Sequence, residues 1–237
     1  MKRIAFIAVL CAFVAAPAFA DIFLPDGTLT ASGEDGYAYS ISSTVMDAQN
    51  TPEVHVSGKV TGYSLPHVNA GWFTIGLITK SERDRALVTY GVPSYMFNQS
   101  AFMMGMKGSS GNVVMPSDYA GDFAGGTGQQ QSIGASFTFD LKLIPSGTAG
   151  GTEYLSINGG AYGTGLAYGK DNWNNYGWSF PAEDLSQAYL IAQLYTWDAG
   201  QTYSVSFEDV TAVPIPAAIL LGMLGLGAAG VKLRKHA

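Results

Sequence analysis

The sequence predicts an all-β fold, a single antiparallel β-sandwich, from three observations. Segments within residues 21–212 alternate apolar and polar side chains with a period of two, as strands with one buried face do. No stretch of this region keeps a helical period. Clusters of Gly, Ser, Asn and Pro separate the alternating segments, so we expect roughly nine to eleven strands, a number typical of a sandwich or barrel.

The first expected strands carry their apolar residues on one parity. Apolar side chains occupy odd positions in segments 37–45 and 73–77, and even positions in segment 54–60. Each segment is therefore predicted to be a half-buried antiparallel strand. The residues expected to face the core are Tyr37, Tyr39, Ile41, Val45, Val54, Val56, Val60, Phe73, Ile75 and Leu77.

The later strands complete the sandwich. Segment 136–143 is apolar at odd positions, and segment 188–197 is apolar on both parities, which is typical of a central strand buried on both faces. Tyr203, Val205 and Phe207 indicate a closing strand, and Asp209 continues their apolar parity. Either a bulge shifts the register at Asp209 or its carboxylate points inward near the end of the sheet.

Composition favours an exported domain. Only 13% of the 237 residues are charged, against about 25% in a typical soluble domain, while 30 are glycine and 12% are aromatic. The net charge of −6 offers no basic surface for nucleic acid. Cys11 is the single cysteine, which excludes a disulfide scaffold and a Cys-ligated zinc site.

Residues 1–20 are predicted to be a secretory signal peptide, helical in its apolar part. Lys2 and Arg3 precede an apolar run over residues 4–16, and the small residues Ala18 and Ala20 precede Asp21. This order of basic, apolar and small residues is the one that signal peptidase recognises. We expect cleavage between Ala20 and Asp21, which leaves a mature chain without cysteine.

Residues 213–237 form a second predicted segment with its own function. An apolar stretch, residues 218–231, lies between a proline motif and a basic motif. As a helix, the 19 residues from 215 to 233 would be about 28 Å long, close to the ~30 Å thickness of the hydrocarbon core of a membrane. The prolines are expected to stop the preceding strand and open this transmembrane helix, with the basic tail on the cytoplasmic side. The two motifs are Val213, Pro214, Ile215, Pro216 and Ala217, and the basic Lys232, Arg234 and Lys235.

This order of proline motif, apolar helix and basic tail resembles the PEP-CTERM sorting signal. Segment 213–217 is most similar to its VPLPA-type variant, with Ile215 where the variant usually has Leu. The resemblance implies cleavage near residues 214–217 by an exosortase, a membrane transpeptidase-like protease of Gram-negative bacteria that make exopolysaccharide. It also implies that the C-terminal helix first anchors the chain in the inner membrane. The protein would then pass to the cell surface or the extracellular matrix of a biofilm.

The remaining domain, residues 21–212, is distinctly acidic. Five of the 12 basic residues and none of the 18 acidic residues lie in the two end segments, so 7 basic residues remain and the domain carries −11. Such a domain is repelled by anionic phosphate and attracts divalent cations. Nucleic acid is therefore not an expected partner.

The internal alternating pair and the closing strand 204–210 resemble jelly-roll modules of the carbohydrate-binding and concanavalin-like kind. In such modules an acidic residue on the closing strand often helps to hold a structural calcium. The resemblance makes Asp209 the candidate ligand, since oxygen donors suit this ion. No cofactor is required by any other feature of the chain.

Loop 171–178 contains three large aromatic residues among amides. Aromatic rings stack on the apolar face of a sugar while amides bind its hydroxyls, so the loop is a candidate for glycan contact. The alternative is that the rings fold back and close one end of the sandwich. The candidate ligand-binding residues are Trp173, Asn174, Tyr176 and Trp178.

No catalytic residues are expected. His55 lies on the polar parity of its strand and should face solvent, and His67 lies in a turn; neither has a neighbouring acidic pair in the sequence, which makes a poor metal site. Two carboxylate pairs, Glu82 with Asp84 and Glu183 with Asp184, lack the E-x-D-x-x-E strand motif of concanavalin-like glycosidases. We therefore expect that the chain is not an enzyme.

Together these features predict an exported protein of the Gram-negative surface or matrix, with a structural or adhesive role and contact with exopolysaccharide. A surface glycosidase or lyase on a concanavalin-like sandwich is the alternative. A third hypothesis is a module that assembles with itself through exposed strand edges.

Overall fold

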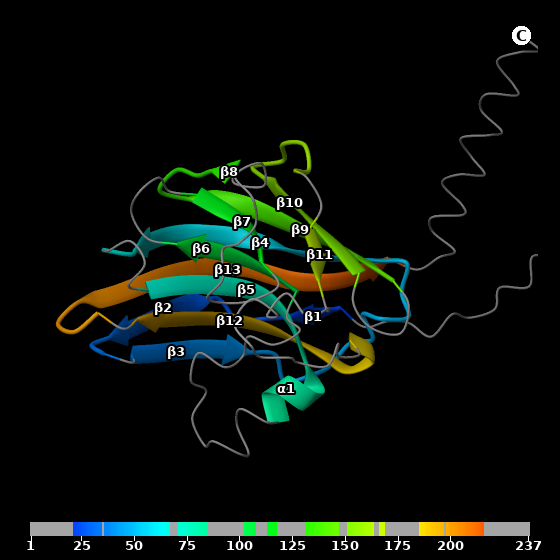
Figure 1. Cartoon of the computed structure of the whole chain (residues 1–237), viewed down its shortest axis with the longest axis horizontal. Helices are drawn as coiled ribbons and strands as arrows, with labels where there is room; N and C mark the ends of the chain where they lie inside the picture. Colours follow the sequence, from blue (N-terminus) through cyan, green and yellow to red (C-terminus); the bar gives the residue numbers. More distant parts are fainter. Residues whose placement is uncertain are drawn as a thin grey trace, which may run out of the picture.

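The computed structural model of this chain describes residues 21–34, 36–66, 71–84, 102–107, 113–117, 131–146, 151–163, 166–168, 185–196 and 198–215. Thirteen strands within these residues form two antiparallel sheets, so the all-β antiparallel prediction is confirmed, with more strands than expected (Figure 1). The predicted signal peptide and the predicted transmembrane helix lie outside the described residues. No helix in the described part of the chain has the length and apolar character to cross a membrane.

Sheet A carries the strand order β1-β13-β4-β9-β10-β11, with β2 paired to the first half of β13. Its strands are β1 (Ile22–Phe23), β2 (Gly27–Ser32), β4 (Glu53–Ser64), β9 (Phe137–Pro145), β10 (Gly151–Ile157), β11 (Leu166–Tyr168) and β13 (Thr202–Ile215). The long β13 pairs with both β1 and β4, so it joins the N-terminal strand to the centre of the sheet.

Sheet B carries the order β3-β12-β5-β6-β7-β8. Its strands are β3 (Gly36–Ile41), β5 (Gly71–Thr79), β6 (Phe102–Lys107), β7 (Val113–Ser117), β8 (Gln131–Ser132) and β12 (Ala188–Thr196). Two short helical turns accompany it, α1 (Lys80–Asp84) and η4 (Leu185–Gln187).

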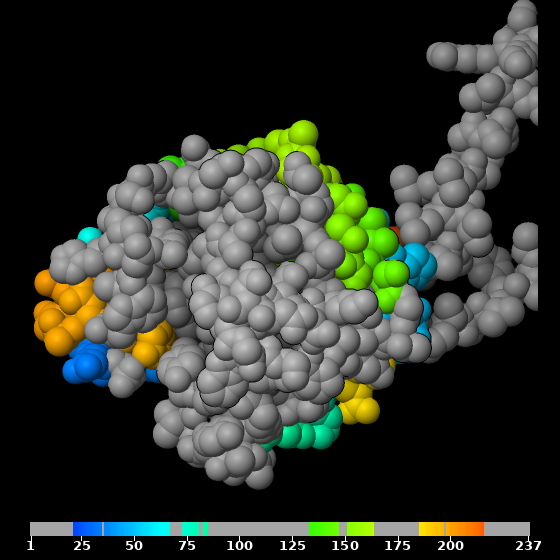
Figure 2. Space-filling model, viewed as in Figure 1, coloured from blue at the N-terminus to red at the C-terminus, as the bar shows by residue number. Residues whose placement is uncertain are grey.

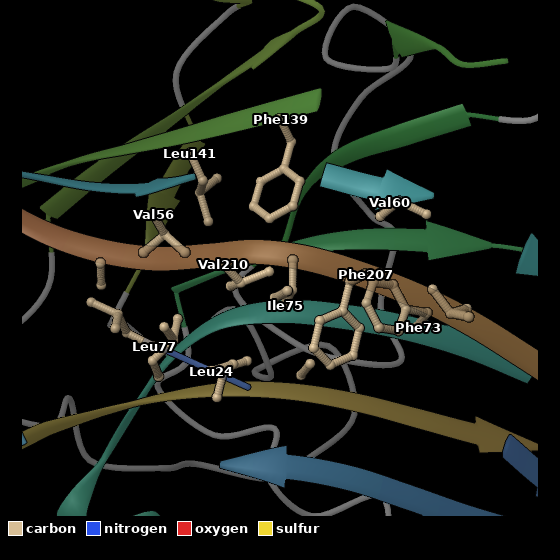
Figure 3. Close-up of a cluster of buried hydrophobic side chains, with 14 of the residues drawn as sticks. Leu24, Val56, Val60, Phe73, Ile75, Leu77, Phe139, Leu141, Phe207 and Val210 are labelled. Carbon is tan, nitrogen blue, oxygen red and sulfur yellow. The ribbon is translucent and has the colours of Figure 1, made fainter. Parts of the chain in front are cut away.

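The core lies between the two sheets (Figure 3). Phe73 of sheet B and Phe207 of sheet A stack with ring centroids 6.5 Å apart, which ties the sheets together. The alternation predicted from the sequence is confirmed for β4, β5, β9 and the first half of β13, whose apolar residues are buried in this core. Strand β12 is buried on both faces, as its two apolar parities predicted.

The expectation for segment 37–45 is wrong in two respects. Ala38 packs against the core, so Tyr37 and Tyr39 lie on the outer face of sheet B. Val45 lies beyond the end of β3 and is 39% exposed. Apolar parity does not identify the core-facing side here because the outer face of sheet B is also largely buried at its centre, where Ile78 and Ile191 have no exposed surface.

A bulge interrupts β13 at Asp209. Of the two alternatives predicted for this residue, a bulge or an inward-pointing carboxylate, the structure has the bulge. The register passes from Glu208 opposite Lys59 to Thr211 opposite Ser57, so two residues of β13 face one residue of β4. Asp209 takes a left-handed conformation with φ of 55° and is exposed. The next side chain, Val210, returns to the core at 1% exposure.

The end of β13 differs from the prediction that the prolines stop the strand. The strand runs through Val213 and Pro214 to Ile215, and Pro214 is buried in register with Val54 of β4. Strand β1 lies on the other side of β13 and its described pairing ends opposite Ala212, so Pro214 extends beyond that neighbour. Proline is tolerated in a strand where its missing N–H has no partner to satisfy. Strand β13 thus includes the first three residues of the proline motif.

Candidate functional site

Two groups of side chains stand out among the described residues. One, here called the His55 cluster, lies on the outer face of sheet A and consists of Glu53, His55, Asp140, Lys142 and Tyr162. The other, here called the tyrosine face, lies on the outer face of sheet B and consists of Tyr37, Tyr39, Thr74, Gln193 and Tyr195.

The His55 cluster is assembled across neighbouring strands. Alternation in β4 sends Val54 and Val56 inward and leaves Glu53 and His55 outside; alternation in β9 leaves Asp140 outside. His55 Nε2 donates to Glu53 Oε1 at 2.6 Å, and His55 Nδ1 donates to Asp140 Oδ1 at 2.9 Å. The histidine therefore has an acidic pair, which corrects the expectation drawn from sequence neighbours alone.

This geometry favours the protonated form of His55. Ionised carboxylates only accept hydrogen bonds, so both ring nitrogens must donate, and only the imidazolium form does so. The hydrogen bond to Asp140 raises the pKa of His55 above its usual value against the opposing effect of burial, and Glu53 adds to the increase. Burial works against ionisation of Asp140, but the hydrogen bonds from His55 and Tyr162 outweigh it and lower the Asp140 pKa.

Tyr162 and Lys142 close the cluster. The Tyr162 hydroxyl donates to Asp140 Oδ2 at 2.7 Å, and Lys142 Nζ lies 4.2 Å from the centroid of the Tyr162 ring. A cation over an aromatic ring is attracted by the electron-rich face. Because Tyr162 follows the end of β10, these contacts bind the 158–163 segment to the outer face of sheet A.

The hydrogen bonds of the cluster favour the protonated forms of its histidine and its tyrosine. The pKa of His55 is raised, chiefly by the hydrogen bond to Asp140. Burial followed by the hydrogen bond to Asp140 raises the pKa of Tyr162 far above its usual value. No group of three or more His, Cys, Asp or Glu residues suited to a metal ion occurs in the described ranges.

The tyrosine face joins three adjacent strands of sheet B. Gln193 of β12 lies opposite Tyr39 of β3 and Thr74 of β5, and the neighbouring Tyr195 lies opposite Tyr37. The Tyr37 hydroxyl donates to Gln193 Oε1 at 2.5 Å. Ring centroids are 5.9 Å apart for Tyr37 and Tyr39, and 6.4 Å apart for Tyr37 and Tyr195.

Burial differs along this face. Gln193 and Thr74 have no exposed surface, whereas Tyr39 at the edge strand is 38% exposed. The Thr74 hydroxyl is buried without a hydrogen-bond partner. An unsatisfied buried hydroxyl carries a desolvation cost, which a ligand or a water molecule would relieve. Rings, an amide and a hydroxyl side by side are the groups that recognise sugars.

The candidate residues predicted from the sequence have different outcomes. The aromatic loop with Trp173, Asn174, Tyr176 and Trp178 lies outside the described residues, as do His67, Glu183 and Asp184. Asp209 is exposed at its bulge, where its backbone N–H donates to Asp26 Oδ1 at 2.8 Å. Asp84 pairs with Lys80 and Arg83 of its own helical turn, which places it in a local ion pair.

Sequence reasoning missed both groups for the same reason. Strand alternation places Glu53 and Asp140 on outward parities, and Glu53 lies two residues from His55 on the same strand. The pairing of Asp140 with His55, however, depends on the register between β4 and β9, which are far apart in the sequence. Tyr37 and Tyr39 were expected to face the core because they share one parity with Ile41. The proximity of Gln193 to three tyrosines was visible only in the pairing of β3, β12 and β5.

No family model matches this chain, and no curated protein matches it. Among solved structures it is similar to an endo-1,3-β-glucanase from Streptomyces sioyaensis, at 10% identity over 80% of this chain and 77% of that one, with a TM-score of 0.45. It is also similar to an alginate lyase in complex with dimannuronate, at 8% identity over 79% and 74%, with a TM-score of 0.45. A legume lectin-like domain from Entamoeba histolytica shares 10% identity over 82% and 83%, with a TM-score of 0.42.

The expectation that the chain is not an enzyme is contradicted by this set. Its members include glucanases and an alginate lyase, which are enzymes. At 8–10% identity and TM-scores near 0.45, these structures assign no functional residue to this chain.

Proposed function

We propose that this chain is an exported bacterial surface protein with a carbohydrate-related function, whose tyrosine face contacts polysaccharide. The observation that carries the proposal is the Tyr37–Gln193 hydrogen bond at 2.5 Å between tyrosine rings on the outer face of sheet B. Gln193 has no exposed surface, so its amide holds Tyr37 in place beside Tyr39, whose 38% exposed ring is the part of this face that a sugar ring can reach.

The composition of the outer face of sheet B supports this proposal. Near the middle of β12 the face is aliphatic, with Ile191 opposite Ile41, between Tyr189 at the start of the strand and the later residues. Towards the end of β12 it becomes aromatic and polar, with Gln193 and Tyr195.

Export and sorting are proposed from the two end segments. The signal-peptide pattern with Ala18, Ala20 and Asp21 supports secretion, and the resemblance of residues 213–237 to the PEP-CTERM signal supports transfer to the surface by an exosortase. The proposal includes a structural calcium at Asp209. The acidic charge of the domain and the exposure of this residue support it.

Binding is tested with immobilised polysaccharides of two classes, a neutral glucan and a polyuronate. The domain carries −11, so we expect the neutral glucan to be preferred at low salt. Tyr39→Ala should weaken binding about fivefold, the loss expected for one aromatic contact. Tyr154→Ala on the outer face of sheet A is the matched control and should bind as the native chain does.

Equal binding by native chain and Tyr39→Ala would exclude the tyrosine face. The same samples are analysed for polysaccharide chain length over time. Shortened products that appear with the native chain would identify enzymatic turnover, and an unchanged length distribution would identify binding alone.

A further inference from the structure

One border of sheet A is formed by strand β2, and no described strand covers it. Strands β1 and β2 both pair with the side of β13 that faces away from β4, and β2 has no second neighbour among the described strands. Figure 1 shows β2 on the left of the molecule, close to β3 of sheet B. In Figure 2 the blue residues of the segment that contains both strands lie on the surface, beside the orange residues near 200.

The register of β2 on β13 determines which backbone groups of β2 point away from the sheet. Gly33, directly after the strand, donates from its N–H to Gln201 O at 3.1 Å. In an antiparallel ladder, pairs that exchange backbone hydrogen bonds alternate with pairs that do not. Leu29 therefore uses its N–H and C=O on β13, whereas the same groups of Thr28 and Thr30 point outward.

Side-chain contacts agree with this assignment. Thr28 Oγ1 lies 2.7 Å from Ser206 Oγ, and facing side chains are closest in the pairs that share no backbone hydrogen bond. At the other end of β2 the border is covered. A Cβ at Gly36 would lie 2.5 Å from Ser32 O, so the residue that begins β3 lies against this backbone group. The open part of the border is therefore residues 28–30.

The open part lacks the features that usually protect the border of a sheet. Strand β2 has the sequence Gly-Thr-Leu-Thr-Ala-Ser, without a charged residue, a proline or a described bulge. Thr28 and Thr30 are exposed, and no described backbone group bonds to their outward N–H and C=O groups. Proteins normally place lysine, proline or a bulge at such a border, because unpaired backbone groups in a strand recruit another strand. The open part is therefore suited to strand addition.

We propose that β2 pairs with β2 of a second copy of this chain, antiparallel, about a two-fold axis at Leu29. The sequence Thr28-Leu29-Thr30 reads the same in both directions, so Thr28 of each copy meets Thr30 of the other, and the two leucines meet on the axis. The threonines then extend the hydroxyl-bearing outer face of sheet A, and the leucines, 8% exposed in the single chain, extend the core. A shift by one residue would bring residues from opposite faces together.

A two-fold contact uses the open border of both copies, so assembly stops at two chains. The domain carries −11, which opposes this approach, but β2 itself is uncharged and the acidic residues that flank it in the sequence are Asp26 and Glu34. Backbone hydrogen bonds and the leucine contact supply the attraction, whereas salt screens the repulsion between the two acidic copies. Dimers should therefore become more stable as the salt concentration rises. The inference goes beyond the proposed polysaccharide contact and does not depend on it.

The register is tested by disulfide formation between two forms of the full chain in detergent micelles, both with Cys11→Ser. One form carries Thr28→Cys and the other Thr30→Cys, so a mixed dimer places the two cysteines opposite each other, with Cα atoms about 5.5 Å apart, within the range of a disulfide. Either form alone separates its two cysteines by roughly 8–9 Å, beyond that range. The matched control pair, Ser204→Cys with Ser206→Cys, lies on β13, which described strands cover on both sides.

The mixture of the first two forms should cross-link at least about tenfold faster than either form alone, and faster at high salt than at low salt. The control pair should cross-link no faster when mixed. Equal rates in the mixture, the single forms and the control pair would indicate random collision and overturn the proposed pairing. Absence of cross-linking in every sample would overturn it as well.

The same contact is tested without cysteines by sedimentation of the full chain in micelles. Thr30→Pro removes an N–H that β13 does not use, and Thr30→Lys adds a charge to the border without a change in the backbone. Each should raise the dissociation constant of the dimer at least about tenfold, whereas the uncharged strand former in Thr30→Val should leave it unchanged. A dimer that persists in both Thr30→Pro and Thr30→Lys would show that the chains associate elsewhere, and a native chain that stays monomeric would overturn the dimer itself.

Discussion

At the residue scale, His55 shows how two strands that are distant in the sequence fix a charge. Its two ring nitrogens donate to carboxylates from β4 and β9, and its side chain is 24% exposed, so solvent screens these ion pairs only in part. The Tyr162 hydroxyl shares Asp140 with His55, so one carboxylate orders both the imidazolium and the 158–163 segment. Loss of the proton at His55 would leave Glu53 and Asp140 side by side without their cation.

The first prediction is a pH-dependent contribution of His55 to stability. The folded-state pKa of His55 is raised, so its contribution is fully present below its unfolded pKa of about 6.5 and is lost as the pH rises through the folded-state pKa. The pKa of Asp140 is lowered, so the contribution of Asp140 to the free energy of unfolding is lost as the pH falls through that lowered value. We expect the free energy of unfolding of the native chain to exceed that of His55→Gln by about 1 kcal/mol near pH 6 and by less at pH 9. Urea unfolding at the two pH values measures the difference; an equal difference at both would contradict the role of the charge.

Asp209 supports a second prediction at the same scale. Its φ of 55° disfavours side chains with a β-branch, and glycine adopts this conformation without strain. The free energy of unfolding of Asp209→Val should therefore be about 1 kcal/mol lower than that of Asp209→Gly. Thermal unfolding of the two variants side by side makes the comparison. Equal midpoints would mean that the bulge relaxes when the residue changes.

At the element scale, the bulge in β13 and a glycine in β4 fit one another. The bulge returns Val210 to the core opposite Gly58, and a Cβ at residue 58 would lie 2.8 Å from Val210 Cγ2 and 3.2 Å from Phe139 Cζ. A Cβ at Gly62 of the same strand would meet no heavy atom within 4 Å, which makes this glycine a matched control.

The third prediction follows from this pair. Gly58→Ala should destabilise the fold by about 1–3 kcal/mol, because Val210 and Phe139 must move in a packed core. Gly62→Ala should be neutral or slightly stabilising, since a strand residue other than glycine loses less backbone entropy on folding. Urea midpoints of both variants provide the measurement, and similar losses for both would show that the contact at residue 58 is relieved without cost.

The elements could be predicted where one parity is buried in one core. Val54 and Val56 of β4, and Leu141 and Leu143 of β9, alternate with polar residues and lie in the core as expected. The same rule failed for Tyr37 and Tyr39, because both faces of sheet B at β12 are covered and apolar character no longer distinguishes them.

The candidate sites could not be predicted because they depend on register between distant strands. His55 meets Asp140 through pairing that joins residues 85 positions apart, and Tyr37 meets Gln193 across 156 positions. A period of two tells which side of its own strand a residue occupies and nothing about its neighbour in the next strand. The bulge at Asp209 could be predicted as an alternative from the sequence, because a polar residue stands there at a position where the alternation within one strand calls for an apolar one.

At the scale of the whole molecule, the two end segments meet the fold without spacers. Ile22, the second residue after the predicted leader, is buried at 1%, and Leu24 at 3%. At the other end, Val213 to Ile215 of the proline motif belong to β13 and pair with Glu53 to His55 of β4. A protease that acts on either end therefore works directly at the border of sheet A.

This placement limits where the proposed sorting cleavage can occur. A protease needs an extended substrate whose backbone is not hydrogen-bonded to a neighbouring strand. The backbone of residues 213–215 is paired with β4 in sheet A, so cleavage should follow Ile215. We expect the exported protein to begin at Asp21 and to end at residue 215 or just beyond, within the proline motif, which intact-mass spectrometry of material from the cell surface would resolve. An end before residue 215 would show that β13 unzips for cleavage, and Val54→Ala, which weakens the packing opposite Pro214, should then raise the yield of that product. A chain that retains Ala237 would contradict sorting by cleavage while leaving the membrane anchor in place.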